Sequence, residues 1–115
     1  MTNYDNGAVF EREIKADLIR KGWAAVRSAG SKGTIDVIAY HFNVALFIQA
    51  KKTGVFPPKE RKKLVRLAQR HNAIPMLAEK RSVLFGKRRR GVIFYHLLTI
   101  DGEKGEQFEP TDHNA

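Results

Sequence analysis

Residues 35–51 read IDVIAYHFNVALFIQAK, two apolar runs separated by the short segment HFN. The apolar and β-branched content of both runs predicts two strands, Ile35–Tyr40 and Val44–Ala50, joined as a hairpin. Each run carries a polar residue near one end: Asp36 begins the first and Gln49 closes the second. Because the start of one hairpin strand lies beside the end of the other, we expect these two side chains to meet at one edge of a sheet.

Further helices and strands are predicted on both sides of this hairpin. Residues 10–21 favour an amphipathic helix, because apolar side chains recur there at a spacing of four. A second helix is expected from Lys59 to His71, since the preceding Pro57-Pro58 suits a helix start. Short strands are predicted at residues 23–26, 73–78 and 92–98, with a basic turn at residues 86–91. The order helix-strand-strand-strand-helix-strand-strand predicts an α/β fold, a small mixed central β-sheet flanked by helices.

Length and composition fit one domain with a negatively charged partner. The chain has 115 residues, and 43% of them are apolar, enough for one core. We expect a single domain over residues 1–100 and a polar, flexible C-terminal tail over residues 101–115. The formal net charge is +9, from 21 Lys and Arg against 12 Asp and Glu, and the pI is near 10.1. This balance favours nucleic acid or an acidic membrane surface as the partner.

Several classes of function are disfavoured by what the sequence lacks. There is no Cys, so a disulfide framework and a thiolate zinc site are excluded, and the four His are scattered without ligand spacing. No apolar run is long enough to span a bilayer, and the first residues do not read as a secretory signal. The basic residues do not line one long amphipathic helix, which disfavours membrane binding. An intracellular domain that binds nucleic acid is therefore expected.

A carboxylate lies on the apolar side of the first predicted helix. At about 100° per residue, Glu11 falls in the same sector as Leu18 and therefore points toward the sheet. A charge in that position needs a partner or a metal ion. An ion pair with Lys15, Arg12 or Arg27 would satisfy it, and a second carboxylate nearby would favour a metal site instead.

Asp36, Gln49 and Lys51 form a second candidate group. The spacing of two places Gln49 and Lys51 on one face of their strand, and the hairpin brings Asp36 beside them. Phosphodiester hydrolysis uses oxygen ligands that hold Mg²⁺ together with a cation that stabilises the transition state. The alternative is that Asp36 caps a turn and Lys51 is a solvated strand end.

Five stretches of the chain are similar to the archaeal-type Holliday junction resolvases, a branch of the PD-(D/E)xK nuclease superfamily. They are residues 10–14 (FEREI), 22–31 (GWAAVRSAGS), 35–39 (IDVIA), 49–51 (QAK) and 74–78 (IPMLA). The block VRSAGS followed by Asp36 is more specific than a lone aspartate and lysine. The resemblance implies a restriction-endonuclease-like nuclease fold, and an intracellular location in the cytoplasm or nucleoid of an archaeal, bacterial or virus-infected cell.

The resemblance also implies roles for individual residues, taken position by position. It assigns Glu11 and Asp36 as metal-binding carboxylates, Lys51 as the catalytic lysine, Arg27 as an arginine near the scissile phosphate, Ser31 as a loop serine linked to activity, and Arg12 as a basic residue beside Glu11. The activity implied is that of a homodimer that nicks opposing strands of a four-way DNA junction.

One position departs from the family, because Gln49 stands where glutamate is usual. An amide oxygen can still ligate Mg²⁺, and the backbone carbonyl of Ala50 is a further candidate ligand. The site loses one negative charge, so its affinity for metal is expected to fall. We therefore expect an active enzyme that needs more Mg²⁺ and accepts Mn²⁺ readily.

Clusters of basic residues are predicted to hold the DNA backbone, with selectivity coming from branched shape rather than base sequence. The residues are Arg12, Arg27, Lys32, Lys52, Lys59, Arg61, Lys62, Lys87, Arg88, Arg89 and Arg90. A solvated surface is the alternative for each charge run. Two other functions stay open: a non-catalytic junction-binding protein whose site has decayed through Gln49, and a nuclease of the same fold that acts on other branched or duplex DNA.

Overall fold

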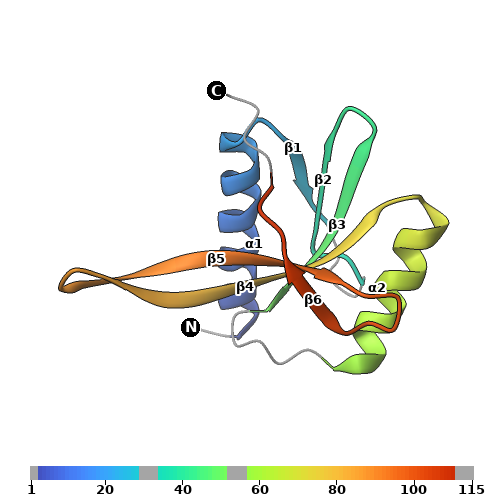
Figure 1. The fold of residues 1–115 in the computed structure, drawn as a ribbon. Helices are drawn as coiled ribbons and strands as arrows, with labels where there is room; N and C mark the ends of the chain where they lie inside the picture. The colour runs from blue at the N-terminus through green and yellow to red at the C-terminus, as the bar shows by residue number, and fades with distance from the viewer. Residues whose placement is uncertain (1–2, 29–33, 52–56, 111–115) are drawn as a thin grey trace.

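The structure is a computed structural model, and it describes residues 3–28, 34–51 and 57–110. In these residues two helices and six strands follow the order α1 (Asn3–Arg20), β1 (Ala24–Arg27), β2 (Val37–His41), β3 (Val44–Lys51), α2 (Pro58–Arg70), β4 (Ile74–Phe85), β5 (Arg88–Leu98) and β6 (Lys104–Gln107). The strands form one sheet in chain order, β1 to β6 (Figure 1). Only β3 and β4 pair in parallel, and α2 connects them, so the sheet is mixed, as the sequence predicts.

The helices cover opposite faces of the sheet. The apolar stripe of α1 packs with Leu46 and Ile48 of β3 in one buried cluster. Phe47, on the other face of the same strand, packs with Leu64 and the rest of the inner side of α2 in a second cluster. A strand covered on both faces needs apolar residues in succession. This explains why the sequence of β3 is a continuous apolar run.

The β2–β3 hairpin forms as predicted. Val37 pairs with Ile48 and His41 pairs with Val44, which leaves Phe42 and Asn43 as the turn. Phe42 has a φ of 52 and is 91% exposed, so its ring lies in solvent at the end of the hairpin. The hairpin register fixes which side chains reach the opposite edge of the sheet, where Asp36 and Gln49 lie.

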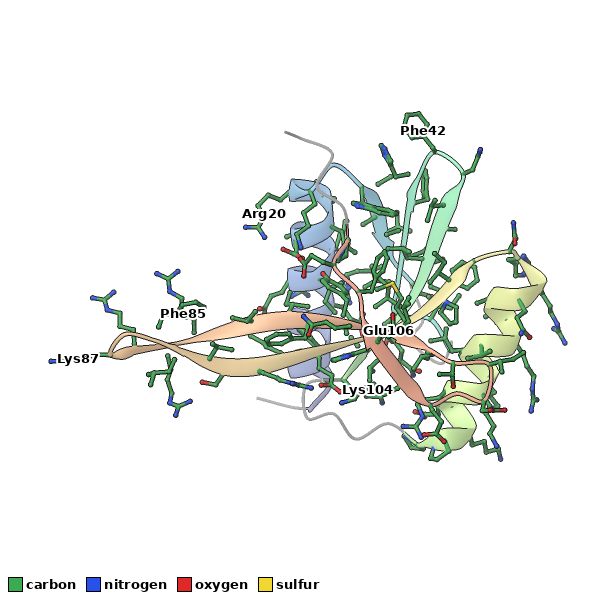
Figure 2. The ribbon with its side chains drawn as sticks, in the orientation of Figure 1. Arg20, Phe42, Phe85, Lys87, Lys104 and Glu106 are labelled. Atoms are coloured by element: carbon green, nitrogen blue, oxygen red, sulfur yellow. The ribbon has the colours of Figure 1, made fainter. Side chains whose placement is uncertain are left out.

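The β4–β5 ribbon is much longer than the sequence analysis predicted. It extends far beyond the rest of the sheet, and Lys87 lies at its tip (Figures 1 and 2). The predicted basic turn at residues 86–91 is wrong in extent: only Gly86 and Lys87 form the turn, and Arg88, Arg89 and Arg90 belong to β5. Gly86 adopts a φ of +62, which glycine tolerates without strain and which allows this tight turn.

Two contacts stabilise the base of the ribbon. Lys80 Nζ lies 2.6 Å from Glu13 Oε2 and so joins the ribbon to α1, while within the ribbon the Arg81 guanidinium of β4 lies 5.2 Å from the centroid of the Phe94 ring of β5. An isolated two-stranded ribbon is marginal in water, so such contacts matter for its order.

The segment from residue 101 to 110 differs from the flexible tail that its composition suggests. Residues 104–107 form β6, which pairs with β5, and the Phe108 N–H donates to the Tyr95 carbonyl over 2.7 Å. Phe108 also packs against the α1-side core. Backbone pairing, rather than apolar content, places this polar segment in the sheet. Residues 111–115 lie outside the described part of the chain. Neither described helix is long and apolar enough to cross a membrane.

Candidate active site

Asp36 lies at the start of β2 and is held by the backbone of β3. Its N–H donates to the Ile48 carbonyl over 2.9 Å, and its Oδ2 accepts a hydrogen bond of 2.8 Å from the Ala50 N–H. Val37 pairs with Ile48 in the antiparallel hairpin, so the residue before Val37 lies opposite the residue after Ile48. Asp36 therefore lies opposite Gln49. The hairpin therefore brings together the two polar residues that open and close its apolar runs.

The Asp36 carboxyl is in an environment that disfavours its charge. Burial raises its pKa from 3.8 to about 6, although the Ala50 N–H partly opposes this. The negative charge of Glu11 raises the pKa further, Lys51 lowers it, and Glu60 raises it. A carboxylate that is partly buried and close to other carboxylates gains from a bound cation, because the cation restores the preference for the ionised form.

Gln49 carries a buried oxygen without a partner. The residue is 6% exposed, and its Oε1 accepts no hydrogen bond from any residue that the structure describes. Leaving a buried acceptor unsatisfied costs about 1–3 kcal/mol. An oxygen of this kind beside a carboxylate is a suitable ligand for a hard divalent cation. Asp36 and Gln49 therefore fit a metal site, with the Ala50 carbonyl as a further candidate oxygen.

Lys51 follows on the same face of β3 as Gln49 and approaches the start of α2. Its Nζ lies 3.7 Å from Glu60 Oε2, and both side chains are partly exposed. Glu60 was not among the residues that the sequence analysis selected. The only sequence signal was a single acid in the basic run KERKK just after a helix start.

Glu11 lies on the α1 side of the sheet. It forms an ion pair with Arg27, the arrangement that the sequence offered as the alternative to metal binding. Its Oε1 lies 3.3 Å from Arg27 Nε. The stripe of Phe10, Ile14 and Leu18 is buried, which confirms the predicted rotation of the helix. The pair does not exclude Glu11 from the site, because its charge still acts on Asp36.

The other predicted residues near this edge lie either outside the described part of the chain or on the surface of the helices. Ser31, Lys32 and Lys52 lie outside the described residues. Arg12, Lys59 and Lys62 are exposed on the helices, and Arg61 is partly exposed. Among residues 3–28, 34–51 and 57–110, no three His, Cys, Asp or Glu side chains gather closely enough to hold a metal ion alone. A metal at this edge would therefore depend on the amide of Gln49 as well as on carboxylates.

The raised pKa of Asp36 predicts how stability changes with pH in the metal-free protein. The Asp36 carboxyl binds a proton more tightly in the native state than in the unfolded state. The stability that this proton adds to the native state is therefore fully present below pH 3.8 and is lost as the pH rises through about 6. The full shift corresponds to about 3 kcal/mol, which solvent screening reduces to on the order of 1 kcal/mol. Above pH 6, Asp36→Asn should raise the free energy of unfolding by that amount. Urea unfolding at several pH values tests this, and equal stabilities on both sides of the transition would refute it.

Three comparisons place the chain among known proteins. A family model described as "Archaeal holliday junction resolvase (hjc)" matches residues 2–104. The "Crossover junction endodeoxyribonuclease Hjc" of Methanocaldococcus jannaschii is 40% identical over 81 residues, which are 67% of this chain and 60% of that relative. The chain thus spans less than two thirds of the length of this curated relative.

A solved structure supports the same fold. It is Archaeoglobus fulgidus Hjc, described as a Holliday junction resolvase from an archaeal hyperthermophile. It matches with a TM-score of 0.64 at 24% identity, over 79% of this chain and 76% of that one. The restriction-endonuclease-like fold implied by the sequence resemblance is thereby confirmed. With the family match extending over almost all described residues, the chain belongs to the archaeal Holliday junction resolvase family.

Proposed function

We propose that this protein is a metal-dependent endonuclease that resolves four-way DNA junctions. The observation that carries the proposal is the meeting of Asp36, the unpartnered Gln49 oxygen and Lys51 at one edge of the sheet. Family membership supports the activity and the substrate class. Acting on DNA, the enzyme would work inside the cell.

The proposed mechanism uses the residues of this edge in different roles. Asp36 and Gln49 would hold Mg²⁺, with Mn²⁺ as a substitute, and the metal polarises the phosphate and activates water when bound. Lys51 extends from the same strand face and would stabilise the charge that develops on the scissile phosphate. Its ammonium is a compact charge on a flexible stem, which suits it to follow the phosphate through the reaction.

Glu11 and Arg27 would act as a unit beside these residues. The Glu11 carboxylate holds the Arg27 guanidinium at 3.3 Å, and the Arg27 side chain is 32% exposed. A positioned arginine with free N–H groups can bind a phosphate oxygen while it keeps its carboxylate partner. We propose that Glu11 also adds negative charge to the metal site, and that Ser31 and Arg12 contribute to activity.

The proposed DNA surface combines the ribbon tip with the start of α2. Lys87 and the arginines of β5 are exposed along the ribbon, and Lys59 and Lys62 are exposed on the helix. Contacts with phosphates supply affinity without base specificity, which fits recognition of branched shape. Arg27, Arg61, Lys32 and Lys52 are proposed to contact the DNA near the cleaved bond.

We also propose that the protein is a homodimer, so that two active sites face a substrate with approximate two-fold symmetry. Ile100, in the connection between β5 and β6, is 75% exposed. Gly102, two residues further on, approaches Arg61 and Lys62 near the start of α2, so this exposed apolar side chain lies near the second helix and the last strands, where we propose the dimer contact. Small-angle scattering is expected to give twice the chain mass of 13.1 kDa, and Ile100→Glu should shift the protein toward monomer. A wild-type monomer at micromolar concentration contradicts the dimer.

Replacing the amide at position 49 tests its role in metal binding. Gln49→Glu adds a negative charge beside Asp36 and should lower the Mg²⁺ concentration needed for half-maximal cleavage by about tenfold. Cleavage of a junction is measured over a Mg²⁺ series for both proteins at saturating DNA. An unchanged Mg²⁺ concentration for half-maximal cleavage would show that the side chain at position 49 does not contribute to metal binding.

The function itself is tested with a labelled synthetic four-way junction and a linear duplex of matched sequence. Paired symmetric cuts in the junction alone, present with Mg²⁺ and absent with EDTA, support a resolvase. Tight junction binding without cuts in either Mg²⁺ or Mn²⁺ would make the protein a junction-binding protein, an alternative that Gln49 keeps open. Equal cutting of both substrates would identify a nuclease with another target.

A further inference from the structure

We propose that Glu60 supplies a further negative charge to the metal site, beside Asp36 and Glu11, in place of the carboxylate that position 49 lacks. This inference rests on the proposed metal-dependent activity and adds a residue to it. Glu60 lies in the first turn of α2, across from the end of β3. Neither the sequence pattern nor the resemblance assigns it a role.

Glu60 is not needed to begin the helix. The N-cap of α2 is Pro57 and the first helical residue is Pro58, which makes Glu60 the third residue of the helix. A glutamate at this position usually accepts a hydrogen bond from the N-cap N–H, but proline has no N–H to donate. The helix start accordingly has no side-chain cap. The remaining local role is a favourable interaction with the helix dipole, which any acid in the first turn provides.

The Glu60 carboxylate instead faces the candidate site. Its Oε2 is buried and accepts no hydrogen bond from the described residues, although the side chain as a whole is 47% exposed. This oxygen lies 3.7 Å from Lys51 Nζ, a loose ion pair rather than a hydrogen bond. The charge of Glu60 also raises the pKa of Asp36, so the two carboxylates interact across the edge.

The site is short of negative charge without Glu60, because the charge of Glu11 is shared with Arg27. Asp36 brings one negative charge and Gln49 brings a buried, unpartnered oxygen without charge, while Lys51 adds a positive charge nearby. Mg²⁺ in proteins is commonly held through one or two carboxylates together with neutral oxygens and water. A further carboxylate at this edge would balance Lys51 and restore the charge that a glutamate at position 49 would have provided.

Other carboxylates near the site are held by cations. Glu11 is paired with Arg27. Glu79 lies opposite Lys51 in the register of β3 and β4, but its oxygens lie 2.9 Å from Arg81 and 3.3 Å from Lys104. Glu60 combines a loose contact with a partly exposed side chain, so it can reorient toward a cation with little loss.

The test measures metal binding without DNA, so that it does not depend on cleavage. Calorimetric titration with Mn²⁺ compares wild type, Glu60→Gln, Gln49→Glu and the double variant. Glu60→Gln should raise the dissociation constant for Mn²⁺ by about tenfold, and Gln49→Glu should lower it. The double variant should bind Mn²⁺ with a dissociation constant close to that of wild type, because the carboxylate has been moved from position 60 to position 49 rather than removed. Glu106→Gln, which removes an equal charge from the exposed strand β6, should bind Mn²⁺ as wild type does.

The outcomes separate this inference from the proposed function. Mn²⁺ binding that is lost in Asp36→Asn but unchanged in Glu60→Gln would overturn the role of Glu60 and leave the metal site standing. Binding that is indifferent to Asp36 would overturn the metal site itself. A Glu60→Gln variant that unfolds more easily, yet binds Mn²⁺ as tightly as wild type, would assign Glu60 to the helix dipole alone and refute the inference.

Discussion

Asp36→Asn should reduce junction cleavage by about 10³-fold while junction binding is retained. A metal-held phosphate is stabilised by several kcal/mol in the transition state, and each 1.4 kcal/mol corresponds to about tenfold in rate. Asparagine keeps an oxygen that can accept the Ala50 N–H, so the hairpin edge should stay in place. Single-turnover cleavage at saturating Mg²⁺ gives the rate, and a gel or anisotropy titration in Ca²⁺ gives the affinity.

Two controls separate chemistry from folding. Asp101→Asn changes an exposed aspartate in the connection between β5 and β6 and should cleave at the wild-type rate. The Asp36→Asn protein should also be at least as stable as wild type above the raised pKa, because it lacks a partly buried charge. Cleavage by Asp36→Asn within tenfold of wild type would show that Asp36 is not a metal ligand, whatever the fold.

The central part of the site could be predicted because it is local in sequence. Asp36, Gln49 and Lys51 belong to one hairpin, and the side-chain period of two determines which of them share a face. The apolar stripe of α1 likewise determined that Glu11 points inward. The choice of Arg27 over Arg12 or Lys15 as its partner depends on how α1 packs against β1, and no periodicity in the sequence specifies this.

Glu60 was missed for a similar reason. Its importance comes from the approach of α2 to the end of β3, and residues 52–56 separate the two elements in sequence. From sequence alone, an acid in the first turn of a helix is explained by the dipole. The unpartnered Gln49 oxygen and the loose contact with Lys51 appear only when the two elements are placed together.

The long ribbon was missed because its outer part, residues 84–91, is exposed. Residues 79–91 read EKRSVLFGKRRRG, which has neither the alternation of a half-buried strand nor the apolar run of a buried one. Cross-strand pairing carries β4 and β5 outward as far as the Phe85–Arg88 pair. Strand β6 is similar, since its polar sequence forms a strand through its backbone bonds to β5.

The ribbon leads to the second large expected effect, on DNA binding. Arg88 and Arg90 alternate with Arg89 along β5, so they share one face of the ribbon, and all three are exposed. Figure 2 shows Lys87 at the outer end of the ribbon, away from the helices. A basic ribbon of this shape can lie along the phosphate backbone of one duplex of a junction while the body of the protein binds the cleaved strand.

Arg88→Ala/Arg90→Ala should therefore weaken junction binding by about 10²-fold at low salt and reduce the slope of log affinity against log salt by about 2. The matched control is Arg66→Ala/Arg70→Ala, which removes the same charge from exposed positions of α2. If net charge alone drives binding, both variants will lose affinity equally, and the ribbon has no special role. If the ribbon binds phosphates directly, the loss of junction affinity and the change in its salt dependence will be confined to the ribbon variant. Cleavage at saturating DNA should then stay close to wild type, because Asp36 and Lys51 lie at a different edge and are untouched.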